Sequence, residues 1–429
     1  MSTTVPTEPV PGVTDEAHVL KVVSPKTPVI LAVLTLALAA AVGFGGQDGD
    51  TTFRLATRND AFELPEITVP SSPTAWVMVL VMALITAESG RRMLARRTTP
   101  VWLVAAYGVV GMVGFLAWAA AGGSLPVVGL LAGALTLAVP LVFGALGGVL
   151  GERVGVTNIA IDGQLLAGAF AAAMVGSIAG SAWVGVLGAM LAGVLVALVL
   201  GVFAISYFVD QVIVGVVLNV LIIGLTSFMY SQVLVPNTEA LNSPPRLGPV
   251  AIPLLGDIPL LGPIFFRQSP IVYALYVAVV AVTWALYRTR WGLRVRAVGE
   301  HPKAADTVGI NVVRTRYRTL LVAGAIAGAG GAFYTLVSVQ AFNREMTGGA
   351  GYIALAAVIF GKWDPIKATL AALLFGFASN LQGVLSVLGS PVPSEFMLML
   401  PYVVTIFAVA GLVGRSRAPA AVGLPYRKS

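Results

Sequence analysis

Charged side chains are scarce in this sequence. Only 10% of its 429 residues are charged, whereas 57% are hydrophobic. Soluble domains carry about 25% charged residues, so this chain has too few of them to cover a water-facing surface of its size. The composition therefore argues against a soluble enzyme or binding domain and indicates a protein that lies within a lipid bilayer.

Cysteine is absent, and histidine occurs only at His18 and His301. Without cysteine the chain has no disulfide, no thiolate metal site and no thiol nucleophile. Neither histidine belongs to a cluster with Asp or Glu, which argues against a zinc or iron site. We therefore expect no metal site and no cofactor on this chain.

The nucleotide-binding pattern G-x-x-x-x-G-K-[ST] is also absent. Gly361-Lys362 comes nearest to it, but Trp363 follows and the upstream glycine is missing. A phosphate-cradling loop is not predicted, so this chain should not hydrolyse ATP. The sequence has no G-x-S-x-G or H-E-x-x-H site either, and we expect a protein that is not an enzyme.

Long apolar runs dominate what is present. A membrane-spanning helix needs about 20 largely apolar residues. Candidate runs lie at 28–46, 74–90, 101–122, 126–150, 164–180, 182–206, 211–235, 269–287, 319–340, 350–361, 365–388 and 395–414. The runs at 164–180 and 350–361 are short and are typical of half-helices, which a bilayer tolerates only where protein or water covers their backbone. The sequence therefore predicts an all-α, polytopic transmembrane bundle of about 10–12 spans.

Basic residues predict the orientation of this bundle. If the N-terminus is inside, 21 of the 26 Lys and Arg residues fall in inner loops. The outer loops then hold the remaining five, which are Arg54, Arg58, Arg246, Arg267 and Arg344. Cytoplasmic loops carry an excess of Lys and Arg, so we expect both termini to be cytoplasmic and the number of spans to be even. The net charge of +7 is then a topology signal, and no nucleic-acid partner is expected.

The chain divides into four predicted parts. Residues 1–27 are polar and read as a disordered cytoplasmic tail that leads into a retained helix, not as a cleaved signal. Residues 28–125 form an N-terminal transmembrane extension with an acidic outer loop at 47–73. The membrane core covers 126–415, with a basic inner loop at 288–318, and a second cytoplasmic tail covers 416–429.

A second outer loop, residues 236–268, is rich in proline, which prevents a regular helix there. Such a loop is either a surface that meets an extracellular partner or a connector.

The inner loop 288–318 contains the stretch Gly299-Glu300-His301-Pro302-Lys303-Ala304-Ala305-Asp306-Thr307-Val308-Gly309-Ile310. Pro302 suits the first turn of a helix and Gly309 suits its C-terminal cap, so we predict a helix of about two turns between them. The small side chains of Ala304 and Ala305 let another surface approach closely. A short capped helix of this kind suits a subunit that receives force from a separate motor. The alternative is a basic loop that only fixes topology.

The spacing G-x-x-x-x-A-A-x-x-x-G-I resembles the cytoplasmic coupling loop of bacterial ABC importer permeases. The branch concerned contains branched-chain amino acid, ribose-type sugar and nucleoside transporters. The resemblance implies that the motor is a cytoplasmic ABC ATPase. It also implies that the ATPase-coupling residues are Glu300, Pro302, Ala304, Ala305 and Gly309.

Two further stretches support this resemblance over roughly residues 126–415. The first runs Gly151-Glu152-Arg153-Val154-Gly155-Val156-Thr157-Asn158-Ile159-Ala160-Ile161-Asp162-Gly163, and is similar to the GERSGVVNIGLEG signature of nucleoside (guanosine-type) permeases. The second, residues 348–365, is similar to that group's GxGFIALAAVIFGKW-P run. Asp162 stands where the family usually has Glu, and Gln164 where Met or Leu is common. Residues 1–125 lie outside the resemblance.

Several polar residues in or beside apolar runs are candidates for a substrate path. They are Asn158, Asp162, Gln164, Asn219, Phe342 and Asn343. An intramembrane carboxylate usually faces a cavity or a partner, but Asp162 can also lie at the membrane surface. Amides such as Asn219 commonly bond helix to helix. Phe342 beside Asn343 can stack on and bond a nucleobase, with core packing as the alternative.

Two other features lie in the second and third motifs. Glu152 can stay solvated or pair with another subunit. The glycines at 348, 349 and 351 permit a broken helix.

The resemblance implies the permease subunit of an ABC importer in the bacterial plasma membrane, with nucleosides as the cargo. Solute would move inward by alternating access, driven by separate ATPase subunits that bind ATP and Mg²⁺. The implied partners are those ATPase subunits, a second permease (a heterodimer before a homodimer), an extracytoplasmic substrate-binding lipoprotein and membrane lipid. The alternatives are a sugar or branched-chain amino acid ABC permease, and then a secondary transporter, for which coupling-ion carboxylates are not evident.

Overall fold

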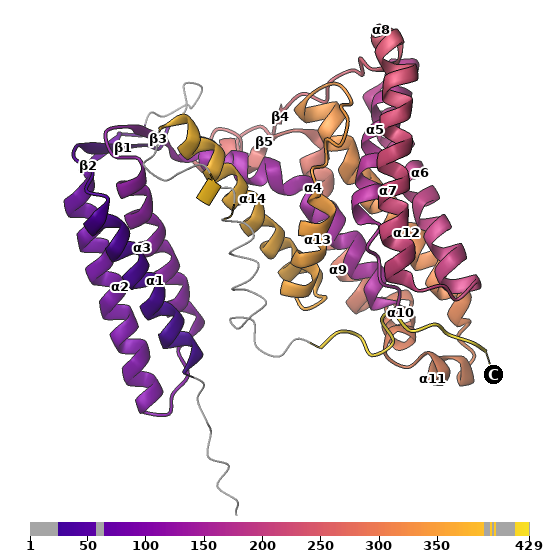
Figure 1. Cartoon of the computed structure of the whole chain (residues 1–429), viewed down its shortest axis with the longest axis horizontal. Coiled ribbons are helices and arrows are strands. Elements are labelled where there is room, and N and C mark those ends of the chain that lie inside the picture. The colour runs from indigo at the N-terminus through magenta and orange to yellow at the C-terminus, as the bar shows by residue number, and fades with distance from the viewer. Residues whose placement is uncertain (1–24, 57–63, 390–394, 397–398, 400–416, 429) are drawn as a thin grey trace, which may run out of the picture. The chain divides into compact units, whose positions relative to one another are not determined.

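The computed structural model describes residues 25–56, 64–389, 395–396, 399 and 417–428. Helices make up most of this part of the chain, which confirms the predicted all-α class. The chain separates into two compact units (Figure 1). Unit 1 consists of Met1–Gly46 and Pro73–Phe115, and unit 2 consists of Gln47–Ser72 and Leu116–Ser429.

Unit 1 is built from α1 (Lys26–Phe44), α2 (Ser71–Leu94) and α3 (Val101–Ala119). Its interior contains a polar contact between helices: the Thr35 and Tyr107 hydroxyls are 2.9 Å apart, and the Tyr107 hydroxyl also donates to the Leu31 carbonyl. Large apolar side chains such as Leu36 and Leu80 point outward. Such side chains suit contact with lipid, because hydrocarbon solvates them at no cost.

Two small sheets interrupt the helical fold. Strands β1 (Asp50–Arg54), β2 (Ile67–Pro70) and β3 (Ser124–Pro126) form one sheet in the order β2-β1-β3. Strands β4 (Val250–Ala251) and β5 (Arg267–Gln268) pair antiparallel. Both sheets involve the two loops predicted to be outer. The sequence analysis did not predict them, because strands this short leave no measurable alternation of polar and apolar residues.

The membrane core in unit 2 consists mainly of long helices. These are α4 (Val127–Arg153), α5 (Ile161–Ala179), α6 (Ala182–Gly201), α7 (Gln211–Met229), α9 (Pro270–Arg288), α12 (Val312–Phe333) and α14 (Pro365–Val387). Short π-helical turns continue α6, α7 and α12 as Val202–Ser206, Tyr230–Leu234 and Tyr334–Ser338, and a fourth lies at Gly262–Phe266. The short helices are α8 (Thr238–Leu241), α10 (Arg290–Glu300), α11 (Pro302–Thr307) and α13 (Ala350–Phe360), with a 3₁₀ turn at Val235–Asn237.

Ten helices in the described part of the chain are long and apolar enough to cross a membrane. The half-helix interpretation of 164–180 is wrong, because α5 starts earlier and has 19 residues. The interpretation of 350–361 agrees with α13, whose 11 residues are too few to span. The last predicted run, 395–414, falls almost wholly outside the described residues.

Figure 1 shows α8, β4 and β5 at one end of unit 2 and α10 and α11 at the other. The proline-rich loop and the basic loop therefore lie at opposite ends of the core, as the predicted topology requires. Which end faces the cytoplasm stays a prediction from the loop charges.

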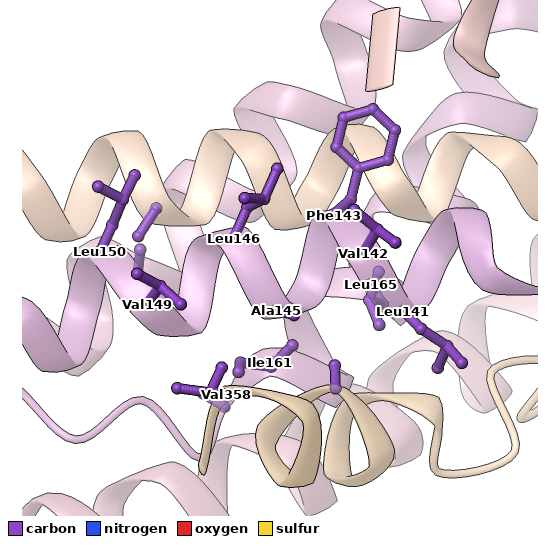
Figure 2. Packing of buried hydrophobic residues seen from close by; sticks show 14 of the residues in the cluster. Leu141, Val142, Phe143, Ala145, Leu146, Val149, Leu150, Ile161, Leu165 and Val358 are labelled. Atoms are coloured by element: carbon purple, nitrogen blue, oxygen red, sulfur yellow. The ribbon is translucent and has the colours of Figure 1, made fainter. Parts of the chain in front are cut away.

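Helix α4 lies in the centre of the core, and its residues from Ala138 to Glu152 are all buried. Glycines on α4 let two other helices come close. Ile161 on α5 contacts Gly144 and Gly148, and Val358 on α13 also contacts Gly148 (Figure 2). Close packing through small residues is the usual way in which helices associate inside a membrane.

A second glycine seam joins α5, α6 and α12. A Cβ atom on Gly328 of α12 would collide with the Ala189 carbonyl on α6, and one on Gly168 of α5 would collide with Gly328 itself. Gly193 on α6 and Gly324 on α12 exclude a side chain from each other in the same way. The three backbones therefore meet with no side chain between them.

Candidate functional site

The three sequence motifs come together at the end of unit 2 that carries α10 and α11. The Arg153 guanidinium donates from Nε to the Trp363 carbonyl over 2.8 Å, which joins the second motif to the third. Gly299, in the coupling motif, lies so close to the Arg153 carbonyl that a Cβ atom would not fit. Gly299 and Trp363, about 150 and 210 positions from Arg153 in sequence, thus both lie against it.

Glu152 is part of this junction and is only 4% exposed. The indole N–H of Trp363 donates to its carboxyl group. Glu152 is therefore not solvated in this structure, and its carboxyl group has a partner within its own chain. Its partner lies 211 positions away, and nothing in the local sequence indicates that contact.

The predicted helix of the coupling motif is confirmed as α11. It begins at Pro302 and ends at Thr307, and Gly309 follows with φ +84°, a left-handed conformation that favours glycine. The two alanines differ: Ala305 is 4% exposed and packs into its own chain, whereas Ala304 is exposed. Of this pair, only Ala304 presents its side chain to an outside surface. Glu300 is exposed, and its carboxylate accepts from the Ala420 amide over 3.2 Å.

The C-terminal stretch 417–428 lies over the same region. The Ala421 amide donates to the Gly299 carbonyl over 2.9 Å, and the Arg316 guanidinium donates to the Leu424 carbonyl over 3.1 Å. Burial and the neighbouring carboxylate of Asp306 raise the pKa of Tyr426, so this phenol stays protonated. The stretch therefore joins α10 and α11 to the start of α12. The sequence analysis treated these residues only as a cytoplasmic tail.

Asp162 lies in the interior and is 3% exposed, so it does not lie solvated at the membrane surface. One carboxylate oxygen accepts from the Gly351 amide over 2.9 Å, and the other accepts from the Thr347 hydroxyl over 3.4 Å. Gly351 belongs to the first turn of α13, where amides lack helical acceptors. The carboxylate therefore stabilises the start of this short helix.

Asn219, which is itself buried, forms a second set of contacts beside Asp162. Its amide oxygen accepts from the Gly163 N–H over 2.8 Å, and its NH₂ group donates to the Ile159 carbonyl and the Tyr352 hydroxyl over 2.9 and 3.0 Å. It thus links α7 to α5 and α13, which is the helix-to-helix role that the sequence analysis left open. Tyr352 was not predicted, although the similar motif has Phe at this place and the extra hydroxyl was a visible signal.

Asn158 and Gln164 bond to each other through their amide groups at 3.1 and 3.4 Å, and both are fully buried. The structure thus brings four of the six substrate-path candidates together around the start of α5. We call this set, together with Thr347 and Tyr352, the polar cluster. Apart from Asp162 its members are uncharged.

The two remaining candidates lie apart from the polar cluster. Phe342 is 0% exposed, and its ring packs edge-on to Phe170 at 5.3 Å. The Asn242 side chain bonds both the amide and the carbonyl of Phe342. Phe342 therefore packs in the core in this conformation, whereas Asn343 is exposed.

The predicted break in the helix before α13 is present. Gly348 and Gly349 have φ +54° and +80°, and α13 begins directly after them. Backbone in this left-handed region strains other residues. The two glycines therefore allow α13 to begin here as a separate short helix.

Fold and site together define a polytopic helical membrane protein whose core contains a polar cluster in which only Tyr352 is exposed. Residues 130–409 match the family described as branched-chain amino acid transport system, permease component. No solved structure matches the chain.

Three curated relatives show how far the similarity extends. The chain is 42% identical to a guanosine ABC transporter permease protein, NupQ of Bacillus subtilis, over 68% of this chain and 95% of the relative. It is 38% identical to a nucleoside ABC transporter permease protein, NupC of Lactococcus lactis, over 70% of this chain and 97% of the relative. It is 35% identical to a putative glucose ABC transporter permease protein of Haloferax volcanii, over 59% and 77%.

The chain belongs to this permease family. It is a membrane permease subunit of an ABC importer and a multi-pass protein of the plasma membrane.

Proposed function

We propose that this subunit imports nucleosides. The observation that carries the proposal is the near-complete coverage of the guanosine and nucleoside permeases at 42% and 38% identity. The similarity to the putative glucose permease is lower in both identity and coverage. A sugar is therefore the second candidate cargo.

The polar cluster is compatible with a neutral, hydrogen-bonding cargo. Asn158, Gln164, Asn219 and Tyr352 offer amide and hydroxyl groups, which suit the ring nitrogens and hydroxyls of a nucleoside. In this conformation these groups bond to one another in two pairs, Asn158 with Gln164 and Asn219 with Tyr352. The three amide side chains are buried, whereas Tyr352 is 47% exposed. Transport by alternating access would then require α5, α7 and α13 to separate at the cluster.

The coupling assignment rests on α11. The exposed residues at this surface include Glu300, which ends α10, and Lys303 and Ala304 within α11. We propose that an ABC ATPase docks on this surface and moves α11 together with α10, whose Gly299 lies against Arg153. With the predicted orientation, this surface faces the cytoplasm.

We infer the remaining partners from membership of the ABC permease family. The ATP and Mg²⁺ would be bound by the ATPase subunits. A second, non-identical permease would complete the pore, with a homodimer as the alternative. A substrate-binding lipoprotein would deliver cargo at the outer loops 47–73 and 236–268.

Competition for uptake tests the cargo. Cells that express this permease with its partners should accumulate labelled guanosine, and unlabelled adenosine or uridine should compete where glucose and leucine do not. Deletion of this chain alone should abolish the uptake. Competition by glucose and not by nucleosides would replace the nucleoside proposal with the sugar alternative.

A further inference from the structure

We propose that unit 2 contains a binding site for the headgroup of an anionic phospholipid, between α10 and the start of α12. A cavity of about 260 Å³ lies there. The residues on which the argument rests are Trp291, Arg294, Asn311, Arg314, Thr315 and Arg318. We call this cavity the basic pocket.

Three arginine side chains converge on the basic pocket without an opposing charge. Arg294, Arg314 and Arg318 are exposed, and none of them forms an ion pair with a carboxylate among the residues that the structure describes. Other arginines in the protein do have partners, such as Arg92, which binds Glu88 at 2.7 Å. Like charges held close together repel, so an anion between them would be stabilised. The guanidinium group binds phosphate in a two-pronged geometry.

The start of α12 adds to this positive potential. The helix has 22 residues, and the amides of its first turn lack helical acceptors. The Asn311 side chain accepts from one of them, the Arg314 amide, over 2.9 Å. The positive end of the helix dipole therefore points toward the pocket together with the three arginines. Thr315 supplies a hydroxyl group at the same place.

The location of the pocket points to a lipid as the source of the phosphate. The spanning helix α9 ends at Arg288 and the spanning helix α12 begins at Val312, so the pocket lies at the level where headgroups lie. Trp291 lines it, and tryptophan is enriched at this level of membrane proteins.

Three large apolar side chains beside lining residues are exposed to solvent. Leu293, next to Arg294, is 61% exposed, and Val313, next to Arg314, is 41% exposed. Val308, next to Gly309, is 75% exposed. Leu293 and Val313 belong to the two helices between which the pocket lies. The acyl chains of a lipid would therefore have apolar side chains to contact there, which a free phosphate ion would not use. Basic pockets at helix ends bind anionic headgroups in this way.

An occupied pocket would link α10 to α12 across the loop that carries α11. This consequence rests on the proposed coupling function, whereas binding of the lipid does not. The binding experiment can therefore fail while the ABC importer assignment stands, and the reverse also holds.

The test measures lipid binding by native mass spectrometry of the purified protein in detergent. The variant carries Arg294→Gln, Arg314→Gln and Arg318→Gln. The matched control carries Arg288→Gln, Arg290→Gln and Lys367→Gln, which removes the same charge from exposed positions outside the pocket and outside α11. Wild type and control should retain phosphatidylglycerol in preference to phosphatidylcholine. The pocket variant should bind phosphatidylglycerol at least about tenfold more weakly, because all three guanidinium contacts to the headgroup are lost.

Two further arms separate the possible occupants. Arg314→Lys keeps the charge but loses the two-pronged contact, so it should give an intermediate affinity, and it serves if the triple variant does not fold. Inorganic phosphate at millimolar concentration should not displace phosphatidylglycerol. The lipid assignment would be overturned if the pocket variant and the control bound phosphatidylglycerol equally, or if phosphate displaced the lipid fully. It would also be overturned if the pocket variant lost binding of the ATPase but kept its affinity for phosphatidylglycerol.

Discussion

Asp162 is the clearest case in which a single residue has a structural role that its sequence position does not reveal. Its carboxylate accepts from the Gly351 amide and the Thr347 hydroxyl and so fixes the start of α13. The same residue lies in the polar cluster, where a solute is proposed to pass. Stability and transport measurements on matched variants can separate these two roles.

We expect Asp162→Ala to lower the stability of the protein, because the Gly351 amide would lose its acceptor. A buried donor left without a partner costs about 1–3 kcal/mol. Asp162→Asn keeps an acceptor oxygen and should cost less. Thermal unfolding of the purified protein in detergent measures both, with the exposed Asn343→Ala as a control. A thermally stable Asp162→Asn variant that has lost uptake would assign the carboxylate to transport, whereas an unchanged melting temperature for Asp162→Ala would contradict the structural role.

The contact between Trp363 and Glu152 gives a second prediction at this scale. Trp363→Phe removes the indole N–H and leaves the buried carboxyl group without that donor. A buried acceptor left without its donor costs about 1–3 kcal/mol, so we expect a loss of stability in that range. In a Glu152→Leu background the same substitution should cost clearly less, because no buried acceptor is then left unpaired. Equal losses in the two backgrounds would show that the contact contributes nothing.

Residue types were easier to predict than residue partners. Asn158, Asp162, Gln164 and Asn219 were selected because polar groups are rare in apolar runs, and the structure gathers all four. Their partners Thr347 and Tyr352 are 185 and 133 positions from the residues they bind. Such pairings depend on how the helices pack, which the sequence of one segment does not specify.

At the scale of elements, helix positions followed from hydrophobicity. The apolar runs predicted most of the long helices to within a few residues, because a bilayer imposes a minimum apolar length. Pro302 and Gly309 likewise predicted the limits of α11. The strands and the π-helical turns were not predicted, because they depend on pairing and packing over five residues or fewer.

The glycine seam between α5, α6 and α12 gives a prediction at the element scale. Gly328→Leu would place a side chain where the Ala189 carbonyl lies, so the two helices would have to separate. Overpacking of this kind costs about 1–3 kcal/mol or more. We expect the variant to lose its monodisperse peak in size-exclusion chromatography. Gly224→Leu on α7, where a Cβ atom meets nothing within 4 Å, is the matched control and should behave like wild type.

Helix α11 gives the corresponding functional prediction. Ala304→Trp adds bulk to an exposed position and should leave the fold intact while it weakens association with the ATPase at least about tenfold, as for a hot-spot position. Co-purification and binding by surface plasmon resonance measure this effect. The control is Ala95→Trp, an exposed alanine in unit 1. Wild-type association of Ala304→Trp would remove α11 from the docking surface.

At the scale of the whole molecule, the contacts between the three motifs lie within the region that matches the permease family. The contacts of Arg153, Trp363 and Gly299 join segments that all lie within 130–409. Unit 1 folds around its own interior contacts and lies outside the matched region. The three motifs therefore contain no residue of unit 1.

The most direct test of the account is transport by the reconstituted complex. Proteoliposomes would contain this subunit, the second permease and the ATPase, with ATP and Mg²⁺ inside and the binding lipoprotein outside. We predict that labelled guanosine accumulates only when ATP can be hydrolysed, and that omission of this subunit abolishes accumulation. Nucleoside uptake driven by an ion gradient with this chain alone, or ATP hydrolysis by the complete complex without any nucleoside uptake, would contradict the account.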